Sequence, residues 1–247
     1  MSFVALSAIG IAVFLASFVS GVFGMAGGMI MLGTLLVFFD VPTGMVMFSL
    51  LATAGNTWRV ASWWRYINWP IFFGYAVGGV IAVLSLRLVA FGPSKAMVYL
   101  ILGLMPHMVE VLPRDRHPNI EWRGVPLLTG FATTAIQLMA GNGGMFLDVF
   151  FQKSTLDRKT TVATKAICGT VGNVARMVYF GTLTGIDETF PLWAFGPAIV
   201  LAIAGTMLAP LLLNRMTDEG FRKWTRKLIL LVSAVYLIRA AWLFWQG

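Results

Sequence analysis

Two copies of the spacing Gly-Asn-x-x-Arg supply the most chemically specific residues of the sequence. They place Asn56 with Arg59 in the first half and Asn173 with Arg176 in the second. Residues three apart share one face of a helix, so each copy offers an amide and a guanidinium in the same direction. Arginine keeps its charge and donates to oxyanions in pairs, which predicts anion binding. The alternative is that Arg59 and Arg176 lie near helix ends and extend toward water.

Two glycine clusters interrupt long apolar segments, and a short apolar arm follows each. A helix that starts inside an apolar segment presents unpaired N–H groups, and glycine lets a ligand approach the backbone, so an anion suits such a position. The alternative is that the glycines only permit close helix crossing. Because cluster and arm both occur twice, we favour the binding role. The candidate residues are Gly27, Gly28, Asn142, Gly143 and Gly144.

Lys165 is a third cationic candidate, because it precedes Arg176 by 11 residues and so falls near the same helical stripe. Asp148 is the only acid in the short apolar arms, and a buried carboxylate with a raised pKa is a candidate proton carrier. A simple Lys165–Asp148 ion pair is the favoured alternative to both roles, and extension of Lys165 toward Lys159 is another. Gln137 and Asn142 either contact a ligand or hydrogen-bond to neighbouring helices.

The composition predicts an all-α, polytopic membrane protein that forms a single membrane domain over residues 1–247. Of the 247 residues, 58% are hydrophobic and 11% are charged, which is too apolar for one soluble core. The net charge of +8 comes mostly from basic residues that flank apolar segments, so it predicts topology and not nucleic-acid binding. The lone Cys168 excludes an internal disulfide, and no His or Cys cluster predicts a metal or cofactor.

The chain contains an internal repeat. Gly27 aligns with Gly143 at an offset of 116, and Gly55 aligns with Gly172 at an offset of 117. We expect repeat 1 over about 1–112, a cytoplasmic linker over about 113–124 and repeat 2 over about 125–247. The expected apolar segments are 3–23, 30–39, 44–64, 69–88, 96–112, 126–138, 145–151, 160–180, 192–213 and 228–245.

Each half is therefore expected to be a broken or re-entrant helical hairpin followed by three transmembrane helices. A hairpin returns to its own side and three spans follow it, so the two halves become inverted repeats, an architecture typical of transporters. This topology places the basic loops on one face. That face is cytoplasmic by the positive-inside rule, and both termini are then outside the cell membrane. The basic loops are Arg65–Asn68, Arg114–Arg123, Lys153–Lys159 and Arg215–Lys227.

The glycine motifs resemble those of the sulfite exporter TauE/SafE family, also called the sulfonate uptake permease family. Phe18–Gly28 resembles its opening signature, and Ala140–Gly144 with Ala163-Thr164 resembles its second signature. The resemblance implies membrane transport of small sulfur-containing or carboxylate anions such as sulfite or sulfoacetate. Family members commonly have a proline shortly after each cluster, whereas Met31–Leu36 and Leu147–Gln152 have none. This departure leaves the exact substrate open.

We therefore expect a secondary transporter that moves a small anion by alternating access, and not an enzyme. An anion channel is the alternative, and a membrane-embedded enzyme is disfavoured because the sequence has no His-metal motif, nucleophile elbow or carboxylate dyad. The expected partners are the small anion and the lipid bilayer. A second copy of the chain is left open as a partner.

Overall fold

The computed structural model describes residues 3–23, 25–111, 118–183, 195–213, 216 and 218–246. Gly24, residues 112–117 of the expected linker and the acidic loop with Asp187 and Glu188 lie outside these ranges. Every regular element in the described ranges is helical, which confirms the all-α prediction. The helices are α1 (Phe3–Phe23), α2 (Met25–Phe38), α3 (Val41–Trp63), the short 3-10 helix η1 (Trp64–Tyr66), α4 (Trp69–Leu88), α5 (Lys95–Val111), α6 (Val125–Ala140), α7 (Gly144–Phe151), α8 (Arg158–Leu183), α9 (Phe195–Leu213) and α10 (Asp218–Gln246).

Two expected boundaries are wrong. The sequence predicts a new helix near Met29, but α2 begins at Met25, so Gly27 and Gly28 lie in its first turn. The sequence also predicts a basic loop up to Lys227, but α10 begins at Asp218. An acid at a helix start is favourable, and basic residues four positions after the acids of this segment favour helix over loop.

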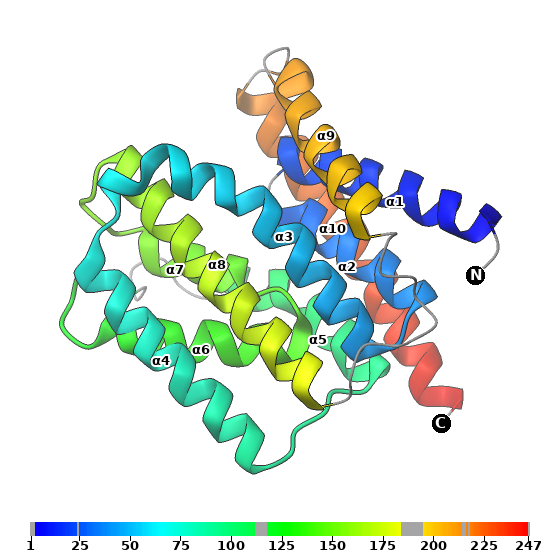
Figure 1. The fold of residues 1–247 in the computed structure, drawn as a ribbon, viewed down its shortest axis with the longest axis horizontal. Helices are drawn as coiled ribbons and strands as arrows, with labels where there is room; N and C mark the ends of the chain where they lie inside the picture. Colours follow the sequence, from blue (N-terminus) through cyan, green and yellow to red (C-terminus); the bar gives the residue numbers. More distant parts are fainter. Residues whose placement is uncertain are drawn as a thin grey trace.

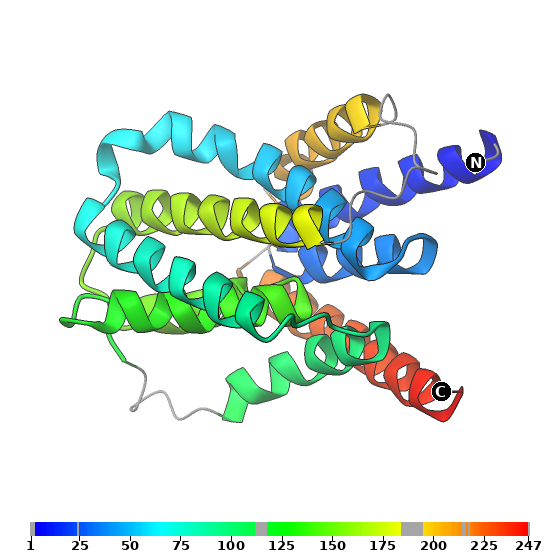
Figure 2. The ribbon, with the colours of Figure 1, turned by 60° about the horizontal axis from the view of Figure 1, so that its bottom comes forward.

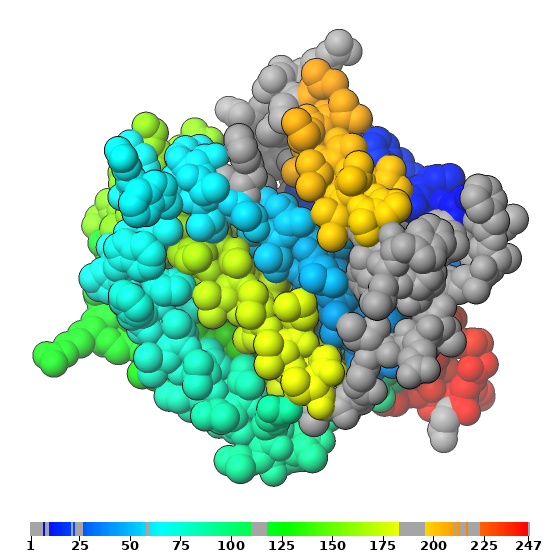
Figure 3. Space-filling view, viewed as in Figure 1, coloured from blue at the N-terminus to red at the C-terminus, as the bar shows by residue number. Residues whose placement is uncertain are grey.

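The helices pack as four principal pairs. Helix α1 packs against α9, α4 against α6, α3 against α8, and α5 against α10. On the face in Figure 3, α3 and α8 lie side by side along most of their length. Helices α4 and α6 approach closely at Gly78, where a side chain would collide with the Leu127 carbonyl oxygen, and at Gly130, where one would collide with the Tyr75 carbonyl oxygen. Close contact through small residues of this kind is typical of helix pairs in membrane proteins.

The two helical hairpins approach the middle of the molecule from opposite ends. Figures 1 and 2 show α1 running inward from the N-terminus and α2 returning toward the same end. Helices α6 and α7 enter from the other end and turn back near the middle. The turns of the two hairpins therefore come together inside the molecule.

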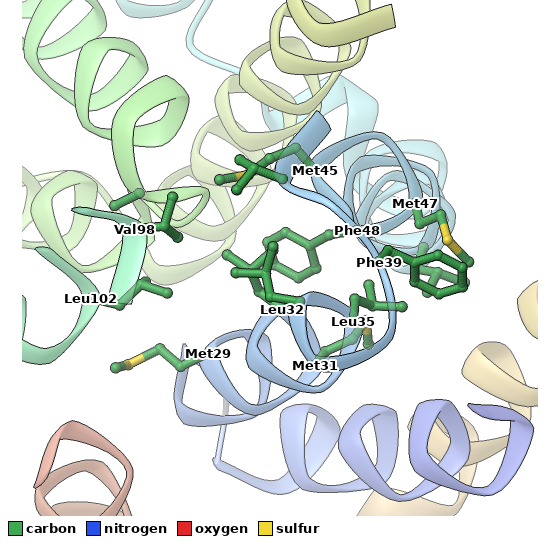
Figure 4. Packing of buried hydrophobic residues seen from close by; sticks show 14 of the residues in the cluster. Met29, Met31, Leu32, Leu35, Phe39, Met45, Met47, Phe48, Val98 and Leu102 are labelled. Atoms are coloured by element: carbon green, nitrogen blue, oxygen red, sulfur yellow. The ribbon is translucent and has the colours of Figure 1, made fainter. Parts of the chain in front are cut away.

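The main hydrophobic core surrounds α2. Leu32, Met45 and Phe48 converge there from α2 and α3, with Val98 and Leu102 of α5 close by (Figure 4). A second cluster surrounds α7 and includes Phe150 and Phe151. These contacts hold both short arms in protein and keep their ends in fixed positions.

Large apolar side chains are exposed along the outer helices. Among the residues that the structure describes, two helical segments, Trp69–Leu88 and Lys223–Gln246, are long and apolar enough to cross a membrane, and five further apolar helices are shorter. Val77 of α4, Met207 of α9 and Ile238 of α10 are all more than half exposed. Apolar surface on this scale is typical of contact with lipid or with another protein.

Candidate functional site

The second glycine cluster interrupts the helix between α6 and α7. Helix α6 ends at Ala140, and Gly141 adopts a left-handed conformation with φ of 78°. Its N–H donates to the Gln137 carbonyl oxygen at 2.8 Å, which closes the helix end. A side chain at Gly141 would be strained by this φ and would also collide with Leu32. Glycine at this position therefore makes the turn possible.

Arg176, on the neighbouring helix α8, donates a hydrogen bond to the turn between α6 and α7. Its side chain is fully buried. The guanidinium donates to the Gly141 carbonyl oxygen, to Ser49 Oγ at 2.8 Å and to Asn173 Oδ1 at 3.2 Å. The Asn173–Arg176 contact confirms that the two residues share a helix face. Extension of Arg176 toward water, the alternative considered from sequence, is excluded.

The positive charge of Arg176 has no carboxylate partner among the described residues. Its hydrogen-bond acceptors are all neutral. The guanidinium also lies over the Phe48 ring, 4.6 Å from its centroid, in a cation–π contact. A buried and uncompensated cation is electrostatically unfavourable unless an anion approaches it. The arrangement therefore favours a negative ligand nearby.

Gln137 and Asn173 complete the polar cluster at this break. Gln137 Nε2 donates to Asn173 Oδ1 at 3.0 Å, so that oxygen accepts from both Gln137 and Arg176. Gln137 thus takes the interhelical role that the sequence left open. The amide oxygen of Gln137 lies where a side chain at Gly172 would be, so Gly172 leaves room for it.

The first glycine cluster meets the second one directly. A methyl group at Gly28 would lie 3.2 Å from Asn142 Nδ2 and 3.5 Å from the Phe48 ring. Gly27 faces the other way, where a side chain would collide with the backbone of Ser20 in α1. Gly27 therefore permits the close α1–α2 crossing, whereas Gly28 faces the contact between the two halves.

Asn142 and the glycines after it form the start of α7. Asn142 Oδ1 accepts from the Gly144 N–H at 3.2 Å, which pairs one of the free N–H groups at that helix end. At Gly143 a side chain would lie 2.5 Å from the Thr133 carbonyl oxygen, so this glycine permits close packing against α6. At the second helix start, Asn142 therefore already pairs one of the free donors within the chain.

A cavity of about 120 Å³ adjoins the first cluster, between α1, α2, α3 and α9. Its polar lining comes from Ser17, Ser20, Asn56 and Thr206, and Gly28 and Phe48 also border it. Ser17 is only 2% exposed, and its hydroxyl makes no hydrogen bond to any residue that the structure describes. Such an unsatisfied hydroxyl is unusual in a folded core and indicates a missing partner.

Lys165 and Asp148 form an ion pair between α8 and α7. Their side chains are 31% and 29% exposed, so the pair is partly open to solvent. The ion pair predicted from sequence is therefore confirmed, and Lys165 is not among the residues that line the cavity. For Arg59, the structure describes only the backbone position, within α3.

The sequence did not predict several residues that contact Arg176 or line the cavity. Ser49 and Gly141 accept from Arg176, and Ser17 lines the cavity, yet none was a candidate. Ser17 and Ser20 carry a usable signal, since two hydroxyls three residues apart in an apolar helix share a face. Ser49 carries none, because its partner lies 127 residues away.

The connection before α6 is clamped to the α7–α8 connection. Glu121 accepts from the Thr155 N–H at 2.7 Å, and Asn119 Nδ2 donates to the Lys153 carbonyl oxygen at 3.0 Å. The Thr155 backbone N–H, and then its hydroxyl, lower the pKa of the Glu121 carboxyl. Ile120, fully buried, anchors the clamp in the cluster around α7.

The comparisons with known proteins identify the family. No curated protein and no solved structure was found to match the chain. The family model for "Sulfite exporter TauE/SafE" matches residues 9–237. That match spans nearly the whole chain and includes both glycine clusters, both Asn-x-x-Arg spacings and the cavity. The resemblance noted in the sequence is thereby confirmed, and the protein belongs to the sulfite exporter TauE/SafE family of membrane transporters.

Proposed function

We propose that the protein is a secondary transporter that carries a small sulfur-containing anion across the cytoplasmic membrane by alternating access. The family supports transport of sulfur anions. The substrate site that we propose lies where the two hairpin turns meet. The residues predicted from sequence that come together there are Gly28, Asn142, Asn173 and Arg176.

The observation that carries the proposal is the buried charge of Arg176. It lies beside both hairpin turns, bonded to the Gly141 carbonyl oxygen and stacked on Phe48, and its acceptors are neutral. A charge inside a membrane protein is costly and usually serves transport. An anion bound within a few ångströms would compensate it, and a cation or neutral solute would not.

The packing supports an inverted-repeat architecture. If the halves are related by an internal two-fold axis, α1 corresponds to α6, and α4 corresponds to α9. The α1–α9 pair then matches the α6–α4 pair, and α3–α8 and α5–α10 lie on the axis. Hairpins that enter from opposite ends fit the same relation (Figure 2). Inverted repeats of this kind are typical of alternating-access transporters.

The charges support a cytoplasmic position for the end that carries η1. Lys159 lies over the Tyr66 ring there, and the Glu121–Thr155 clamp joins the connections before α6 and after α7. Both chain termini lie at the opposite end in Figures 1 and 2. By the positive-inside rule, the basic end is cytoplasmic and the termini are outside.

Transport by purified protein in liposomes tests the proposal. Liposomes loaded with unlabelled sulfite or thiosulfate should accumulate the labelled anion against its gradient, because a carrier exchanges one substrate for another. A channel would only equilibrate the label. Sulfite oxidation or reduction by the protein would favour an enzyme instead, and no uptake of any sulfur anion would refute the proposal.

A further inference from the structure

We infer that the cavity beside Ser17 is the compartment that holds the transported anion, and that its size restricts it to inorganic sulfur oxyanions such as sulfite or thiosulfate. This inference rests on the proposed function. It adds the Ser17 hydroxyl to the donors that the sequence had suggested, and it excludes the larger organosulfonates.

The Ser17 hydroxyl is the first support. It is buried at the cavity wall and unsatisfied by the described residues. A hydroxyl in that position loses its hydration on folding and regains a partner only if something enters the cavity. An anion oxygen in the cavity accepts a hydrogen bond from it once the Ser17 side chain turns toward the cavity.

The neighbouring groups add donors and positive potential. Asn56 of α3 lines the same cavity, and its amide nitrogen is a donor. The cavity also adjoins the first turn of α2 at Gly28, where the helix dipole is positive. Thr206 donates its hydroxyl to the Ala202 carbonyl oxygen at 2.9 Å, so only its oxygen faces a ligand.

Phe48 connects this cavity to the charge. One part of its ring borders the cavity, and the Arg176 guanidinium lies over the ring. The cavity thus borders the residue that Arg176 stacks on, yet it contains no ionisable side chain among its described lining residues. Arg176 is not a lining residue of the cavity, so its charge attracts an anion there through space and without direct contact.

The volume sets the size of the ligand. A dry protein cavity of about 150 Å³ holds one benzene molecule, and this cavity, at about 120 Å³, is smaller. Sulfite and thiosulfate have fewer non-hydrogen atoms than benzene and fit. Taurine and sulfoacetate have more, so we expect them to be too large for it.

Binding to the purified, full-length protein tests the inference, with sulfite, thiosulfate, taurine and sulfoacetate as probes. Ser17→Ala should weaken sulfite and thiosulfate binding about tenfold, while its thermal midpoint stays level or rises because an unsatisfied hydroxyl is removed. The matched control is Thr134→Val, which removes a buried hydroxyl from α6 away from the cavity. The control should leave both affinities unchanged. Wild-type protein should bind neither taurine nor sulfoacetate at comparable concentrations.

The outcomes separate this inference from the proposed function. If sulfite is transported but Ser17→Ala binds it as tightly as wild type, the cavity is not the site and the transporter proposal stands. Sulfoacetate bound as tightly as sulfite would overturn the size restriction. If the wild-type protein neither binds nor transports any of the four anions, the proposed function fails, and this inference fails with it.

Discussion

The two hairpin turns have related sequences but different environments. At the turn between α6 and α7, Gln137, Asn173 and Arg176 form a closed polar network around the Gly141 carbonyl oxygen. At the turn between α1 and α2, the corresponding space is a cavity beside Ser17 and Asn56. One turn is braced by its own chain, and polar residues at the other line a cavity.

Much of this difference comes from one residue, Gln137, which lies at the turn between α6 and α7. Asn56 and Asn173 align at an offset of 117 in the sequence, and Gln137 donates to Asn173 Oδ1 and fills the space beside Gly172. The comparison teaches that a duplicated motif need not perform the same role twice. We assign the braced turn to fold stability and charge placement, and the open turn to ligand contact.

The largest expected effect comes from removal of the brace. Arg176→Met should lower the free energy of unfolding by about 3 kcal/mol or more, because the buried Gly141 carbonyl, Ser49 and Asn173 lose their donor. Arg176→Lys should recover only part of the lost unfolding free energy, because an ammonium group cannot donate to all three acceptors with the planar geometry of a guanidinium. Denaturation in detergent measures both. A variant as stable as wild type would show that the network does not brace the turn.

Equivalent glycines offer a matched pair. Gly172→Ala should lower the unfolding free energy by about 1 kcal/mol, because the new methyl group displaces Gln137 from Asn173. Gly55→Ala, at the equivalent position of repeat 1, meets nothing within 4 Å and should be neutral or slightly stabilising. The thermal midpoints of the two variants test the comparison. Equal thermal midpoints would show that a methyl group is accommodated equally well at Gly172 and Gly55, and would contradict the difference between the two turns.

The Lys165–Asp148 ion pair has an apolar counterpart in repeat 1. At offsets of 117 and 116, Lys165 aligns with Phe48 and Asp148 with Leu32, both of which lie in the main core. Because the pair is partly exposed, Asp148→Asn should reduce stability by less than about 1 kcal/mol.

The same variant tests the role of Asp148 as a proton carrier. If Asp148 carries the proton, Asp148→Asn abolishes accumulation driven by a pH gradient and leaves exchange of labelled for unlabelled anion intact. Lys165→Met is the control that breaks the ion pair but keeps the carboxyl. Proton-driven uptake by Asp148→Asn at the wild-type rate would assign the pair to structure alone.

The smallest expected effect is a pH dependence at the clamp. Hydrogen bonds from Thr155 lower the pKa of Glu121 from its ordinary value of 4.5. The stabilisation is therefore complete above that value and is lost as the pH falls through the lowered pKa. Thermal midpoints from pH 6 to pH 3 should show a shallower acid decline for Glu121→Gln. Identical declines would contradict the contribution of this carboxylate.

The sequence predicted the helices better than the contacts at the site. Apolar segment length placed α4 at Trp69–Leu88, as observed, because twenty apolar residues dictate a helix. The predicted start of α10 was wrong, because a run of basic residues occurs equally in helices and in loops and does not distinguish them. Gly141 and Gly28 were found as clusters, but their partners were not, because hydrogen bonds such as Arg176–Ser49 join residues more than a hundred positions apart.

The most direct test of the account is the location of a heavy-atom substrate analogue. Selenite has the shape and charge of sulfite, and selenium gives an anomalous X-ray signal. Crystals of the protein soaked in selenite should show an anomalous peak in the cavity, within hydrogen-bond distance of Ser17 and Asn56. A peak beside Lys165, with none in the cavity, would contradict the assignment of the open turn to ligand contact.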